Sequence, residues 1–263
     1  MVERIKGSNN QSEGLQAVVR SFVVSLAPVG ELWKEYQKGI INPPILRFYL
    51  GKKGDEETSR LTLFGGKINF NENWQEATQR EITEEIGGRL IGLPWNTSIG
   101  CWSYTIGKKN REVTLTYSPM VPVKEAIIGD DKIKEVKRLT LDELKILIEK
   151  GAIAGVPMEE HLTFIDSHGS IEISVKDKEA KNQALEKGLR WMTHIEAYLQ
   201  RKFESILKKY PNQISQEDFK KEYDQLINYF KRRGLETALI RGKSELKTNS
   251  FRLTEVLDGQ LHG

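Results

Sequence analysis

The stretch GGKINFNENWQEATQREITEEIGG, residues 65–88, sets the fold of this chain because it joins a glycine turn to an acidic helical pattern. Asn73, followed three residues later by Glu76, forms a capping box at a helix start. Gly87 and Gly88 provide the left-handed stop that ends a helix. The sequence therefore predicts a helix that begins after Asn73 and ends at Gly87.

One face of this predicted helix is strongly acidic. Glu81, Glu84 and Glu85 have the i, i+3, i+4 spacing that places side chains on one patch. Like charges at this spacing destabilise a helix by roughly a few tenths of a kcal/mol per pair, and Arg80 alone cannot balance three carboxylates. Mg²⁺ can, because it prefers oxygen ligands and binds through one or two carboxylates together with substrate phosphates. The patch predicts a metal site suited to hydrolysis of a phosphoanhydride.

The glycine pair before the helix strengthens this interpretation. Gly65 and Gly66 allow backbone conformations closed to other residues, so that a carbonyl oxygen can approach the same ion. The alternative hypothesis is a structural helix in which Glu76, Arg80 and Glu84 form an i, i+4 ladder on a solvated face. That alternative explains neither the two glycines nor the excess of acidic residues.

The order of these residues resembles the Nudix box, GX5EX7REUXEEXGU, in which U is a bulky aliphatic residue. Gly66, Glu72 and the run REITEEIG at 80–87 fill its fixed positions at matching spacing. Only Gly88 departs, because it stands where the box has an aliphatic side chain. We expect this departure to change a packing contact at the helix end and to leave the chemistry in place.

The resemblance implies an α/β fold: a Nudix-like α/β/α sandwich with a mixed sheet, assigned here to residues 1–175. Strand-like patterns lie at 15–26, 43–50, 60–64, 97–106, 111–123 and 135–139. A second capping box at Thr140 predicts a helix after the last of these strands. Strands before the box, a hairpin after it and a closing strand with its helix have the order expected of the family.

From residue 176 onward the apolar period changes to 3.6, which predicts a helical extension over 176–263. Pro211 separates one long amphipathic helix from a second, which starts at Ser215 and is predicted to end at Arg233 and Gly234. The resulting αα-hairpin is expected to pack on the first domain or on another subunit, and a homodimer is one form of the second alternative.

The resemblance also implies a set of metal ligands. Glu81 and Glu85 are expected to be the principal ligands of Mg²⁺ or Mn²⁺, with Glu84 in the coordination sphere or next to it. The carbonyl oxygen of Gly65 is expected to be a further ligand.

Catalytic roles follow from the same resemblance. Glu72 and Arg80 are expected to form an ion pair that holds a metal ligand in place. The attacking water is oriented by a box glutamate in some members of the family and by a loop carboxylate in others. The loop candidates here are Asp130, Asp131 and Glu135, of which Glu135 is preferred because it directly precedes the closing strand.

The resemblance implies a nucleoside diphosphate linked to another group as the substrate, and that group is recognised outside the box. Trp102, Tyr104 and Tyr117 on the predicted hairpin are candidates to stack on a base, and burial in the core is the alternative for each. Tyr104 lies 16 residues beyond the box, which resembles the pattern of dinucleoside-polyphosphate hydrolases. A nucleotide sugar is the other substrate considered.

The composition of the chain bears on secretion, membrane insertion and disulfide formation. The chain is 38% hydrophobic and 29% charged, its N-terminal dozen lacks the apolar core of a secretory signal, and no apolar run is long enough to span a membrane. Cys101 is the only cysteine and cannot form an internal disulfide. These features predict a cytoplasmic protein without a membrane partner.

Charge leaves a second function open. Residues 176–263 carry 18 basic against 13 acidic residues, a net charge of +5, which a solvated helical surface explains and which also permits nucleic-acid binding. The first hypothesis is a metal-dependent hydrolase. The alternative is a Nudix-derived nucleotide sensor or regulator whose basic tail binds nucleic acid or a partner protein. All box glutamates are present, which favours the hydrolase.

Overall fold

The computed structural model describes residues 16–53, 60–87, 97–106, 109–120, 133, 135–154, 161–166, 169–175, 177–210 and 213–245. The strands are β1 (Gln16–Leu26), β2 (Leu46–Lys53), β3 (Arg60–Thr62), β4 (Thr97–Ile106), β5 (Lys109–Pro119), β6 (Glu135–Leu139), β7 (Ile153–Ala154), β8 (His161–Asp166) and β9 (Gly169–Val175). The helices are α1 (Val29–Gln37), α2 (Trp74–Ile86), α3 (Leu141–Glu149), α4 (Lys178–Leu207) and α5 (Gln216–Glu245).

The described strands form one mixed sheet. Its order is β7-β3-β2-β1-β5-β4-β9-β8, with β6 paired to β2 beside this path. Pairing is parallel between β1 and β5 and between β3 and β7, and antiparallel elsewhere. Within the described residues, no helix is both long and apolar enough to cross a membrane.

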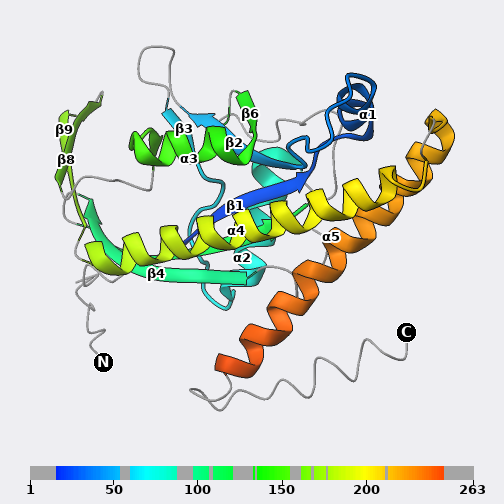
Figure 1. Cartoon of the computed structure of the whole chain (residues 1–263). Helices are drawn as coiled ribbons and strands as arrows, with labels where there is room; N and C mark the ends of the chain where they lie inside the picture. The colour runs from blue at the N-terminus through cyan, green and yellow to red at the C-terminus, as the bar shows by residue number, and fades with distance from the viewer. Residues whose placement is uncertain are drawn as a thin grey trace, which may run out of the picture.

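Helices cover both faces of the sheet. One face packs against α2 in a small core around Ile82, Ile86 and Phe64. The opposite face forms the main core with α3, α4 and α5. Figure 1 shows α4 running across the sheet from the side of β8 and β9 to the side of α1. The predicted α/β/α sandwich with a mixed sheet and a C-terminal helical region is confirmed.

The α4 helix lies very close to β4 because small residues meet at the contact. A Cβ added to Gly100 of β4 would be 2.6 Å from the Cβ of Ala184, and one added to Gly188 would be 3.2 Å from Ile99. Close approach buries the apolar stripe of α4 against the sheet, so packing of the extension on the first domain is confirmed. The division of the chain at 175 stays a prediction.

A buried carboxylate also ties α4 to the start of β2. Both oxygens of Glu196 accept backbone hydrogen bonds, from the N–H of Ile45 at 2.6 Å and from that of Leu46 at 2.8 Å. Burial raises the pKa of Glu196 above the ordinary value of 4.5, although the two backbone donors and Arg47 act against the rise. The fold therefore holds a proton on Glu196 more tightly than the unfolded chain does.

This pKa gives a testable pH dependence. A raised pKa in the folded state means that the Glu196 contribution to stability is complete below about pH 4.5 and is lost as the pH rises through the folded-state pKa. We expect the free energy of unfolding of the wild type to fall, relative to that of Glu196→Gln, as the pH rises above about 4.5. Urea denaturation at several pH values measures the free energy of unfolding of both proteins. A constant difference between the two proteins would contradict the assignment.

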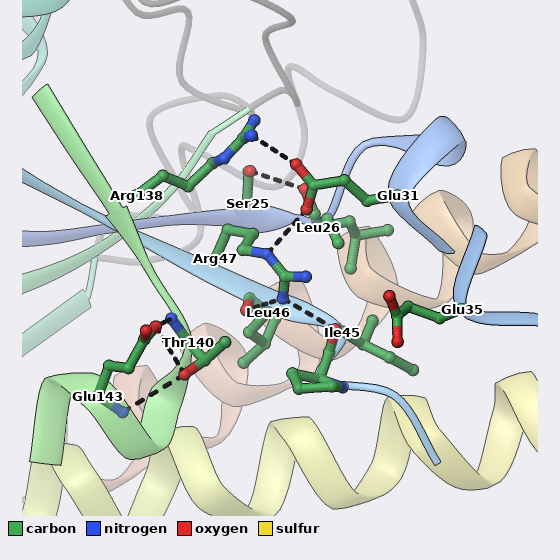
Figure 2. A network of polar contacts seen from close by, with 12 residues as sticks. Ser25, Leu26, Glu31, Glu35, Ile45, Leu46, Arg47, Arg138, Thr140 and Glu143 are labelled. Atoms are coloured by element: carbon green, nitrogen blue, oxygen red, sulfur yellow. Dashed lines mark hydrogen bonds and ion pairs between the residues drawn. The ribbon is translucent and has the colours of Figure 1, made fainter. Parts of the chain in front are cut away.

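Helix α1 was not predicted from the sequence. Its N-cap is Pro28, which makes no side-chain capping bond, so the usual start signal is missing. Instead, tertiary contacts hold it: Figure 2 shows Glu31 of α1 between Arg47 of β2, at 3.1 Å, and Arg138 of β6. At the other side of α1, the ring of Phe219 in α5 lies 5.0 Å from that of Trp33.

Two further expectations about secondary structure were incomplete or wrong. The second helix of the extension does not end at Arg233 and Gly234, because α5 continues to Glu245. A single glycine lowers helix stability by only about 1 kcal/mol, so it does not by itself stop a helix. The hairpin of β8 and β9 was not predicted, and it extends the sheet beyond β4.

Candidate active site

The site is built on a glycine turn that lies beside β1. The N–H of Val19 donates to the carbonyl of Gly66 at 2.9 Å, which fixes this turn against the strand. Gly65 has φ +132°, and a Cβ at this residue would lie 2.3 Å from the carbonyl oxygen of Val19. Only glycine fits at this position.

The carboxylate of Glu85 lies against the first glycine. The residue is 3% exposed, and its Oε2 accepts a hydrogen bond from the N–H of Gly65 at 2.8 Å. Ile82 and Ile86 of the same helix are buried in the small core beneath α2. Their packing sets the rotation of the helix about its axis, and this rotation points Glu85 at the turn.

Glu81 lies against the second glycine. A Cβ at Gly66 would be only 2.3 Å from Oε1 of Glu81, so the carboxylate fills the space that a side chain would need. The same oxygen accepts a hydrogen bond from Nη1 of Arg80 at 2.7 Å. The carboxylates of Glu81 and Glu85 therefore lie against two consecutive residues, Gly66 and Gly65, although the two glutamates are one helical turn apart.

Arg80 neutralises most of the acidic face of α2. Its Nε and Nη2 donate to the two oxygens of Glu72 at 2.9 and 3.0 Å. Its Nη1 donates to Glu81 and, at 3.2 Å, to Glu84, and Nη2 also donates to the carbonyl of Lys67 at 2.8 Å. The bond to Glu72 raises the pKa of Arg80 and lowers that of Glu72. The ion pair expected between these two residues is thus present.

Glu84 differs from the other two carboxylates of the predicted patch in its exposure. Its side chain is 54% exposed and contacts Arg80. Among the residues that the structure describes, no group of three or more His, Cys, Asp or Glu side chains is arranged to hold a metal ion. The expected role of Glu84 in or next to the coordination sphere stays a prediction. Glu81, Glu85 and the Gly65 carbonyl are a donor set that fits a cation completed by substrate phosphates and water.

Glu135, the preferred loop carboxylate, is the first residue of β6, which pairs with β2. Its Oε2 is 3.7 Å from Nζ of Lys52 on β2. The structure thus pairs Glu135 with a lysine, and its role as base or ligand stays a prediction. Asp130 and Asp131 lie outside the described residues, as does Gly88.

Two of the aromatic candidates are buried on the wrong face of the sheet. Trp102 and Tyr117 are 2% and 1% exposed and belong to the main core beneath α4, whereas the glutamates lie on the α2 side. The ring of Tyr117 is 4.3 Å from that of Trp191, and burial raises the pKa of its hydroxyl. Neither ring is open to stack on a base, so this expectation is corrected. Tyr104 lies on β4, but its side chain is outside the described part of the chain.

Arg20 is a site residue that the sequence reasoning missed. It lies on β1, and its Nη1 donates to the carbonyl of Gly65, the same carbonyl expected to face a metal. No motif marks it, because it is 45 residues away from that glycine. The signal in the sequence was a single charge within the mostly apolar strand QAVVRSFVVSL.

The contact between Glu81 and the turn can be tested by Gly66→Ala. The new Cβ would displace the Glu81 carboxylate, which is flexible enough to move, so we expect the melting temperature to change little. Displacement of a site residue by about 1 Å can cost roughly 10²-fold in rate, and we expect a loss of that order in kcat/KM. Thermal unfolding and steady-state kinetics measure the two effects. Full activity in Gly66→Ala would show that the position of Glu81 on the turn is not required.

Comparisons with known proteins place this site in a family. Residues 46–162 match the NUDIX domain. No curated protein matches the sequence. Among solved structures, a MutT protein from Methanosarcina mazei Go1 is 18% identical, with 52% of this chain and 83% of that chain covered and a TM-score of 0.36.

Two other solved structures are similar at the same level. An Ap4A hydrolase from C. elegans is 11% identical over 51% of this chain and 87% of its own, with a TM-score of 0.37. A NUDIX family hydrolase from Clostridium perfringens is 14% identical over 68% of this chain and 99% of its own, with a TM-score of 0.37. The segment matched to the NUDIX domain contains the glycine turn, α2 and β6, which are the elements that build this site.

Proposed function

We propose that this protein is a metal-dependent hydrolase that cleaves a pyrophosphate bond in a nucleoside diphosphate linked to another group. The observation that carries the proposal is the meeting of Glu81 and Glu85 at the Gly65–Gly66 turn. A carboxylate pair beside a backbone carbonyl is a donor set for Mg²⁺ or Mn²⁺. When bound, such an ion supplies Lewis-acid polarisation of a phosphoryl oxygen and activation of water.

The residues of the chain have separate roles in this proposal. Glu81 and Glu85 would hold the ion, and Gly65 would offer its carbonyl oxygen. Arg80 keeps Glu81 in position and removes the repulsion that neighbouring carboxylates would otherwise exert on an anionic substrate. Glu84 is exposed enough to orient a water, and Glu135 is the second candidate for that role.

The identity of the group linked to the diphosphate is a separate question. With Trp102 and Tyr117 buried, the hairpin residue that still marks a substrate class is Tyr104, whose spacing from the box resembles that of dinucleoside-polyphosphate hydrolases. We therefore include diadenosine tetraphosphate first among the substrates to be tested. ADP-sugars, nucleoside triphosphates and capped RNA complete the panel.

Incubation of the purified full chain with this panel tests the proposal. We expect cleavage of at least one compound in the presence of Mg²⁺ or Mn²⁺ and none after chelation. Analysis of the products by mass spectrometry in ¹⁸O-labelled water identifies the phosphorus atom that is attacked. If the chain binds one nucleotide tightly and cleaves nothing, the sensor or regulator hypothesis replaces the hydrolase.

A further inference from the structure

Arg20 brings a second cation to the glycine turn. Its guanidinium reaches from β1 to the carbonyl of Gly65, and the N–H of the same glycine donates to Glu85. The positive charge of Arg20 is therefore close to the carboxylate of Glu85, because both side chains bind the backbone of Gly65. The proposed function would place a pyrophosphate at this turn.

The other arginine of the site has no capacity left for a phosphate. A guanidinium has five N–H donors, and those of Arg80 are directed at Glu72, Glu81, Glu84 and the carbonyl of Lys67 in five hydrogen bonds. To bind a phosphate oxygen, Arg80 would have to release one of these acceptors. Its role is to position carboxylates.

Arg20 has donors to spare. Its Nη1 is the nitrogen that contacts Gly65, and its Nε is buried without a hydrogen-bond partner in the described part of the structure. A buried donor that lacks an acceptor is unfavourable, and the guanidinium fork is well suited to two oxygens of a phosphate. A diphosphate oxygen at the turn would accept a hydrogen bond from the guanidinium, whose positive charge would offset the negative charge of the diphosphate.

From these contacts we propose that Arg20 binds the diphosphate of the substrate directly. This inference rests on the proposed function, because it assumes that the diphosphate lies at the Gly65–Gly66 turn. It assigns Arg20 as a specificity residue for the diphosphate itself, whatever group is attached to it. The competing explanation is that Arg20 serves only to hold the turn.

Methylenediphosphonate is a suitable probe because it presents two linked phosphoryl groups without a hydrolysable bridge. We would measure its dissociation constant by isothermal titration calorimetry with Mg²⁺, using the full-length wild type, Arg20→Gln and Arg20→Lys. Arg190→Gln is the matched control, because Arg190 is 68% exposed and its ion pair is with Glu186 on α4. Melting temperatures of all four proteins report any structural effect.

We expect Arg20→Gln to weaken binding of the probe roughly 10- to 100-fold, the usual range for losing a hydrogen bond to a charged group. Arg20→Lys should recover part of the affinity because it keeps the charge but not the fork. Arg190→Gln should bind like the wild type. In kinetics on a cleaved substrate, KM should rise for Arg20→Gln more than kcat falls.

Equal affinity of the wild type and Arg20→Gln for the probe would overturn the inference, as would a wild type that does not bind the probe at all. If Arg20→Gln does not fold, equal affinity of Arg20→Lys and the wild type overturns it instead. Failure of the proposed function looks different: the wild type would bind the probe through Arg20 and cleave none of the panel.

Discussion

Glu85→Gln is expected to lower kcat/KM by about 10³-fold or more, because a metal ion in a hydrolytic site supplies several kcal/mol and each 1.4 kcal/mol is tenfold in rate. Glutamine keeps an oxygen that can accept the hydrogen bond from the N–H of Gly65, so the turn should stay in place. The lost property is the negative charge of a buried group. Steady-state kinetics measures the fall in kcat/KM, and Mn²⁺ titration followed by electron paramagnetic resonance measures the loss of metal affinity.

Glu84→Gln is the matched control for this substitution. Glu84 is on the same helix one residue earlier, but its side chain is 54% exposed and contacts Arg80. We expect its loss to cost less than Glu85→Gln in metal affinity. If the two substitutions lowered metal affinity equally, the distinction between a buried ligand and an exposed neighbour would be lost. Wild-type kcat/KM in Glu85→Gln would rule out Glu85 as an essential ligand.

Local signals in the sequence predicted α2 and its ends correctly. The capping boxes at Asn73 and Thr140 are both present, and Gly87 has the left-handed conformation that ends α2. Each of these features depends on residues that are close in the chain, and their physics is largely independent of the rest of the fold. The ion pair of Glu72 and Arg80, which the resemblance to the Nudix box implied, is also present.

Features that depend on residues far apart in the chain could not be predicted from local sequence signals. Alternation placed Trp102 and Tyr117 on a hairpin, but it could not say which face of that hairpin is covered. The cover is α4, whose Trp191 is 74 residues beyond Tyr117, so the burial of these rings is decided by tertiary packing. Arg20 was missed for the same reason, since its partner is 45 residues away.

The helical extension is the largest feature whose role the sequence left open. Side chains of α4 and α5, among them Met192, Leu199 and Phe203, share one hydrophobic cluster with the sheet. Glu196 of α4 accepts hydrogen bonds from the N–H groups of Ile45 and Leu46, where β2 begins. We propose that residue 175 marks the end of the Nudix part of the chain without marking the end of a folding unit.

Leu199→Ala tests this proposal and is expected to destabilise the whole protein. Leu199 is fully buried, and truncation of such a residue to alanine costs about 2–5 kcal/mol through lost burial and the cavity that remains. For a domain of this size, we expect the melting temperature to fall by roughly 5–15 °C. Calorimetry should show one transition, displaced as a unit, because the sheet and α4 lose the same core contact.

Glu186→Ala is the control, because Glu186 is 71% exposed on the same helix and its substitution should change stability by no more than about 0.5 kcal/mol. The shape of the calorimetric trace separates the two models of the chain. If α4 and α5 formed an independent unit, Leu199→Ala would split the trace, with an early transition for the helices and an unchanged later one for the sheet. Such a split would contradict a shared core, and a single displaced peak would place the extension within the folding unit that supports the site.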